Sequence, residues 1–181
     1  MEEWNSTNKL LEAKESLAKL LQEAQARAMD SLELNTMFRR KMDLLTQPFA
    51  EFLKNLDEYD KLDEEIKKHI VVVKTLPEYR MLLEKTANTA TVEDTLAHEN
   101  AHLNKAESLG VPVEGYAIIV SKNEKGFVYA PYAEYKMPTS WDQRRQIEAN
   151  IQIANAPHEY GNRLSPTDEK RIEELKKQLE N

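Results

Sequence analysis

The chain contains no cysteine and few glycines. Its 181 residues include 4 Gly and 7 Pro. Without cysteine there is no disulfide and no thiolate ligand, so a metal site would have to use imidazole and carboxylate groups. The absence of disulfides fits the reducing cytoplasm, where we expect the protein to reside. We expect no secretion signal, because the first residues are acidic and no apolar segment follows them.

The sequence also lacks an apolar run long enough to span a membrane, and it lacks an excess of positive charge. Its formal net charge is −7, from 25 Lys and Arg against 32 Asp and Glu. This balance argues against electrostatic binding of nucleic acid through its phosphates. With 40% apolar residues the chain can bury one moderate core. We therefore expect neither a membrane nor a nucleic acid as a partner.

What the sequence does have is a pair of histidines four residues apart, with a glutamate directly after the first. In His98-Glu99-Asn100-Ala101-His102 this spacing brings both imidazoles to one face of a helix, one turn apart. A helix is expected here because Thr91 can cap its start and because Gly110, followed by Pro112, ends it. Two such imidazoles are typical ligands of a tetrahedral zinc ion, and Glu99 reaches the same rim of the helix.

The segment Thr95-Leu96-Ala97-His98-Glu99-Asn100-Ala101-His102-Leu103 carries no flanking charge other than Glu99. It resembles the extended HExxH motif of the zincin superfamily of zinc metallopeptidases, from which Asn104 departs because an apolar residue is more usual there. The resemblance covers about ten residues. It implies a Zn²⁺ cofactor held by His98 and His102, and a peptide or protein substrate. Glu99 would be the general base for a zinc-activated water that attacks the peptide carbonyl.

A third zinc ligand is less obvious. The metzincin pattern is excluded, since Lys105 and Ser108 stand where it requires Gly and His. Gluzincins take a glutamate from a later helix, and Glu148 borders the apolar face of the helix expected from Trp141 until just before Pro157. We therefore predict Glu148 as the third ligand, with His158 as the fallback. Two further carboxylates stay open as weaker candidates, Glu134 and Glu114.

The rest of the sequence predicts a mainly helical α+β fold in three parts. Residues 1–68 are expected to form an N-terminal helical arm or hairpin, because apolar residues recur there at helical spacing. Residues 69–164 should form a zincin-like metal-site domain, with a strand at Ile70–Val73 and a hairpin of strands at 113–121 and 127–135. For residues 165–181 the sequence predicts a charged helix that starts at Ser165-Pro166-Thr167-Asp168 and packs on this domain.

These observations lead to two functional hypotheses. The first is a small gluzincin-type zinc metallopeptidase. The alternative is a helical interaction or scaffold protein with a vestigial or structural metal site, whose N-terminal helices bind a second copy of the chain or another protein. A complete third ligand and an open groove beside Glu99 would favour the enzyme. A filled, dry site and a large exposed apolar stripe on the N-terminal helices would favour the scaffold. A di-iron bundle would need a second Glu-x-x-His pair, which the sequence lacks.

Overall fold

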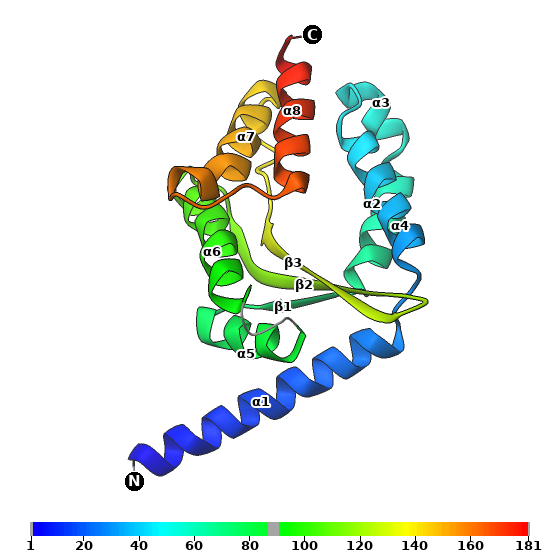
Figure 1. Cartoon of the computed structure of the whole chain (residues 1–181). Coiled ribbons are helices and arrows are strands. Elements are labelled where there is room, and N and C mark those ends of the chain that lie inside the picture. Colours follow the sequence, from blue (N-terminus) through cyan, green and yellow to red (C-terminus); the bar gives the residue numbers. More distant parts are fainter. Residues whose placement is uncertain (1, 87–90, 181) are drawn as a thin grey trace. The chain divides into compact units, whose positions relative to one another are not determined.

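The computed structural model describes residues 2–86 and 91–180, and these residues are mostly helical. Figure 1 labels the elements along the chain. The helices are α1 (Glu2–Ala26), α2 (Ser31–Leu45), α3 (Phe49–Lys54), α4 (Leu56–Lys67), α5 (Leu76–Thr86), α6 (Val92–Ser108), α7 (Gln143–Glu159) and α8 (Pro166–Glu180). The strands are β1 (Ile70–Val73), β2 (Val113–Asn123) and β3 (Gly126–Tyr135). The expected mainly helical α+β class is confirmed. No helix in the described ranges has the length and apolar character of a membrane span.

The three strands form one antiparallel sheet in the order β1-β2-β3. Strand β2 pairs with the segment at the start of β1, where the backbone N–H of Val120 donates to the carbonyl of His69 at 2.8 Å. The turn between β2 and β3 is closed by the Asn123 side chain, which accepts the N–H of Lys125 at 2.8 Å. Gly126 then adopts a φ of 125°, which residues with a Cβ rarely reach. The predicted first strand and the predicted hairpin are both confirmed.

The chain forms two compact units, each built from two stretches of sequence. The first takes in Met1–Val71 and Ile118–Ala130. In this unit α2 packs on α4, and the Lys41 ammonium lies 2.6 Å from the Asp63 carboxylate between them. The buried apolar side chains of the unit include Leu17, Leu21, Leu34, Leu44 and Ile66.

The second unit takes in Val72–Ala117 and Pro131–Asn181, and it contains α5 to α8. Helix α6 contacts both α5 and α7, and α7 contacts α8. Tyr79 and Leu82 of α5 are fully buried, and Ile153 of α7 is 1% exposed. Figure 1 shows α6 in green, α7 in orange and α8 in red within this unit. Because α6 and α8 both pack on α7, residues from these three helices come together in space.

Helix α7 begins and ends later in the chain than the sequence predicts. Its start is capped by Asp142, whose side chain accepts the N–H of Arg145 at 2.8 Å. The helix was expected to end before Pro157, but it continues to Glu159 with Pro157 inside it. That expectation is wrong. Proline usually ends a helix because it leaves the carbonyl four residues earlier without its helical donor, and here that carbonyl has another partner.

Candidate metal centre

Helix α6 carries the two histidines, and its end is fixed by a local backbone motif. Gly110 has a φ of 77°, so the chain turns out of the helix at this glycine. The N–H of Val111 donates to the carbonyl of Ala106 at 2.9 Å, and the N–H of Gly110 donates to that of Glu107 at 3.0 Å. These two bonds are the Schellman motif, and Ala106 and Val111 also pack together in the core. The predicted helix stop is therefore confirmed.

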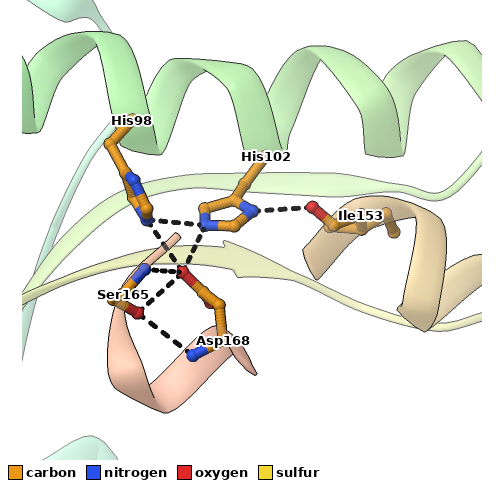
Figure 2. Close-up of polar contacts among 5 residues, drawn as sticks. All are labelled: His98, His102, Ile153, Ser165 and Asp168. Atoms are coloured by element: carbon orange, nitrogen blue, oxygen red, sulfur yellow. Dashed lines mark hydrogen bonds and ion pairs between the residues drawn. The ribbon is translucent and has the colours of Figure 1, made fainter. Parts of the chain in front are cut away.

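His98 and His102 of α6 converge with Asp168 of α8 on one small volume, as Figure 2 shows. Nε2 of His98 lies 3.0 Å from Oδ2 of Asp168 and 3.1 Å from Nε2 of His102. Nε2 of His102 lies 3.6 Å from the same Oδ2. Zinc bonds of about 2.0–2.1 Å in a tetrahedron put neighbouring ligand atoms about 3.3–3.4 Å apart. The three atoms are thus spaced as three ligands of one small cation would be.

The protonation of His102 follows from its second ring nitrogen. Nδ1 of His102 lies 2.7 Å from the carbonyl oxygen of Ile153 in α7. A carbonyl oxygen only accepts, so Nδ1 carries a hydrogen, and whenever the ring is neutral it presents a lone pair at Nε2. That lone pair faces a carboxylate oxygen and a second imidazole, each of which is also an acceptor. Either a proton on Nε2 of His102 or a bound cation can satisfy these acceptors, so protons and a metal would compete for this position.

Asp168 is held in place by the residue that begins its own helix. The Ser165 hydroxyl accepts the backbone N–H of Asp168 at 3.1 Å and donates its proton to Oδ2 of Asp168 at 2.7 Å. The backbone N–H of Ser165 lies 3.4 Å from the same Oδ2. This is a capping box, and it confirms the helix start predicted at Ser165 to Asp168. Oδ2 of Asp168, which faces the histidines, is therefore oriented by its hydrogen bonds with Ser165 at the N-terminus of α8.

Asp168 and His102 have shifted pKa values because each contacts the other. Burial alone would raise the pKa of Asp168, but hydrogen bonds from His102, His98 and Ser165 hold it well below its usual range, so the side chain is a carboxylate. Burial disfavours the charged form of His102, but the hydrogen bonds with Asp168 and Ile153 outweigh it and raise the pKa of His102. Without a metal, the site therefore favours the imidazolium form of His102 beside the Asp168 carboxylate, and a bound cation would displace the proton from Nε2.

Glu99 lies on α6 between the two histidines and is almost fully buried, with 7% of its surface exposed. Burial raises its pKa to about 7, against the opposing effect of the two histidines. Tyr79 packs nearby with its hydroxyl donating to the carbonyl of Ala117 at 3.1 Å, and Glu99 contributes to the raised pKa of this tyrosine. A carboxyl group that titrates near neutral pH can both accept and release a proton under physiological conditions.

The other carboxylates and the histidine considered as third ligands lie elsewhere. Among the described residues, the group that could hold a metal consists of His98, His102 and Asp168. Glu148 lies on α7 and pairs with Arg144 one turn earlier, at 2.9 Å, with 46% of its side chain exposed. The side chains of Glu114 and His158 are exposed, and that of Glu134 accepts a hydrogen bond from Tyr132. The carboxylate that lies within reach of both histidines comes from α8 rather than from α7.

Two of the three side chains at the centre are partly exposed to solvent. The side chain of His98 is 17% exposed and that of Asp168 is 16% exposed, whereas that of His102 is 8% exposed.

No protein-family model matches the chain, and no curated protein or solved structure matches it either. The chemistry of this centre therefore has to be inferred from its geometry.

Proposed function

We propose that this protein is a zinc-dependent metallopeptidase, with His98, His102 and Asp168 as metal ligands and Glu99 as general base. The observation that carries the proposal is the convergence of three ligand atoms, 3.0 to 3.6 Å apart, next to a helix that also carries the buried carboxyl group of Glu99. The HExxH pattern at residues 98–102 supports the same assignment. The third ligand differs from the glutamate of the gluzincins, because this chain supplies an aspartate.

The ligand set favours a catalytic site over a structural one. Structural zinc sites in proteins are normally closed by four protein ligands, whereas catalytic sites have three and an open position. In the described part of the chain the group has three members. A bound zinc ion would supply a Lewis acid that lowers the pKa of water toward neutrality and polarises a peptide carbonyl. Imidazole and carboxylate groups are common zinc ligands, and the chain has no thiolate to offer.

Glu99 performs the proton transfers in this proposal. Its carboxylate accepts the proton of the attacking water and then delivers it to the nitrogen of the leaving amine. The pKa of about 7 suits both steps, because the group is partly ionised at neutral pH and can return the proton it takes. Burial beside His98 and His102 keeps this carboxyl away from bulk water, where it would titrate near its ordinary pKa.

One observation favours the alternative, an interaction or scaffold protein. Several large apolar side chains of the N-terminal helices are exposed, which is what a docking surface for another protein would show. They include Leu10 (50%), Leu11 (55%), Phe49 (73%) and Leu53 (51%). This second function does not require a metal, so zinc binding and peptide cleavage separate the two hypotheses.

The experiment measures metal content and peptide cleavage of the purified, untagged protein. We expect about one zinc per chain by plasma mass spectrometry, lost in His98→Ala. Glu99→Gln should retain zinc but lose about 10²–10⁴-fold in cleavage rate, as expected for removal of a general base. Glu107→Gln is the matched control, because Glu107 is an exposed glutamate on the same helix and should leave both readouts unchanged. A wild-type protein that takes up no zinc when it is offered would refute the proposal and leave the scaffold hypothesis.

A further inference from the structure

We propose that Pro157 is a positioning residue for the metal centre, because it leaves the carbonyl of Ile153 free to orient His102. The inference rests on the metal site of the proposed function, and it adds a residue that touches neither metal nor substrate. It also explains why a proline is found inside α7.

The first step is the backbone of α7. In an α-helix each carbonyl accepts the N–H of the residue four positions later, so Ile153 would be served by residue 157. Residue 157 is a proline, which has no N–H, and its ring also crowds the carbonyl four residues before it. The carbonyl of Ile153 is therefore without its helical donor.

The second step is the replacement donor. Nδ1 of His102 lies 2.7 Å from the Ile153 oxygen and donates to it. Ile153 is 1% exposed, and Pro157 is among the fully buried side chains of the chain, so bulk water does not compete at this position. A buried carbonyl without a donor is unfavourable, so this carbonyl and the imidazole N–H each satisfy the other. The bond also explains how α7 continues past a proline.

The third step links this bond to the metal ligands. With its hydrogen on Nδ1, the neutral His102 ring directs the lone pair of Nε2 at Oδ2 of Asp168 and at Nε2 of His98. Such a bond to the non-ligating nitrogen fixes both the tautomer and the orientation of a metal-binding histidine. At position 157 any other residue would bring an N–H aimed at the same oxygen. The helix and His102 would then compete for one acceptor, and His102 would be held less firmly.

The test is the affinity for zinc, measured by competition with a chromophoric chelator, in wild type, Pro157→Ala and Pro157→Val. Both substitutions restore the N–H, while alanine is smaller and valine is larger than proline. We expect both variants to bind zinc about 10-fold more weakly, at the lower end of the 10–100-fold effect of losing such a partner, because the carbonyl becomes shared rather than absent. Pro77→Ala is the control, since Pro77 is exposed in the first turn of α5, where a missing N–H frees no helical carbonyl, and it should bind as wild type does.

A second measurement reports on the same bond without metal. At a pH above the pKa of His102, where its ring is neutral, the ¹⁵N shifts of His102 in the zinc-free protein should show the hydrogen on Nδ1 in wild type and a mixture of tautomers in Pro157→Ala. Circular dichroism is the check that both proteins are folded. Zinc affinity and tautomer that match wild type in both Pro157 variants would overturn the inference and leave the proposed function intact. A wild type that binds no zinc would refute the proposed function. The tautomer comparison would then still decide whether Pro157 orients His102.

Discussion

The identity of the third ligand can be tested by comparing Asp168→Asn with Glu148→Gln. Each substitution replaces a carboxylate by its amide with little change in shape. In the structure Asp168 faces both histidines, whereas Glu148 pairs with Arg144 on the surface of α7. Asp168→Asn should therefore lose zinc affinity. Glu148→Gln should lose only an exposed helix pair, which contributes about 0.3–0.5 kcal/mol.

The size of the effect follows from linkage between binding and folding. Removal of a side chain that hydrogen-bonds to a metal ligand weakens metal binding by about 10–100-fold. We therefore take about 100-fold for removal of the ligand itself. At free zinc of about 1,000 times the wild-type Kd, zinc should stabilise wild type by about 4.1 kcal/mol and Asp168→Asn by about 1.4 kcal/mol. With an unfolding entropy of about 2.1 cal/mol/K per residue over 181 residues, these energies correspond to increases in Tm of about 11 °C and about 4 °C.

The assay is thermal unfolding of each protein with excess zinc and with a chelator. The quantity compared is the zinc-dependent increase in Tm, because a substitution can also change the stability of the metal-free protein. Glu148→Gln should show the full wild-type increase. If instead Glu148→Gln abolished the increase and Asp168→Asn kept it, the ligand set deduced from the structure would be refuted and Glu148 would be the third ligand.

Two further predictions concern Ser165 and Asp63. Ser165→Gly and Ser165→Ala should both weaken zinc binding by about 10–100-fold, because each removes the hydroxyl that donates to Asp168. Only Ser165→Ala should also lose the helix cap, which contributes about 1 kcal/mol, and Ser165→Thr should keep both zinc affinity and the cap. Calorimetric titration measures the zinc affinity, and urea unfolding measures the stability. A Ser165→Gly variant with wild-type zinc affinity would contradict the role of the hydroxyl. At Asp63, burial is outweighed by hydrogen bonds from Lys41 and Lys67, so its pKa is lowered in the folded protein. Its stabilisation should be complete above the unfolded pKa of about 3.9 and lost as the pH falls below it. Urea unfolding at pH 7 and pH 3 should accordingly show a difference between wild type and Asp63→Asn that shrinks at pH 3, and a constant difference would count against this ion pair.

The features that the sequence predicted correctly have signals close to them in the chain. The end of α6 is set by Gly110 and by bonds that reach back no further than Ala106. The hairpin at residues 123–126 and the start of α8 at Ser165 are equally local. Such motifs depend on the conformational preferences of a few adjacent residues, and these preferences can be recognised without knowledge of the tertiary structure.

The carboxylate that lies beside the two histidines had no such local signal. Asp168 lies 70 residues after His98, and it comes near only because α6 and α8 both pack on α7. Glu148 was chosen because it borders an apolar face, and its neighbour Ile147 is indeed buried, at 7% exposure. Periodicity predicts which face of a helix is buried but not which other helix lies against it. Glu148 therefore lies next to that face and pairs with Arg144 instead.

The compact units could not be inferred from composition for a related reason. Each unit takes in two separated stretches of sequence. Strand β2 (Val113–Asn123) passes from the second unit to the first, and β3 (Gly126–Tyr135) passes back. A change in composition along the chain can only mark contiguous segments. A strand that has residues in both units shows no change in composition where one unit ends and the other begins.

The two groups that orient the ligands share a physical origin. The Ile153 carbonyl is available because Pro157 interrupts the hydrogen bonding of α7, and the Ser165 hydroxyl is engaged because the first N–H groups of α8 have no helical acceptor. Both are polar groups that a regular helix cannot satisfy. A buried site needs oriented partners behind its ligands, and interruptions and ends of helices are where the backbone leaves such partners free. Pro157 predicts the end of a helix. A proline four residues after a buried carbonyl also indicates that this carbonyl needs a hydrogen-bond donor from another side chain.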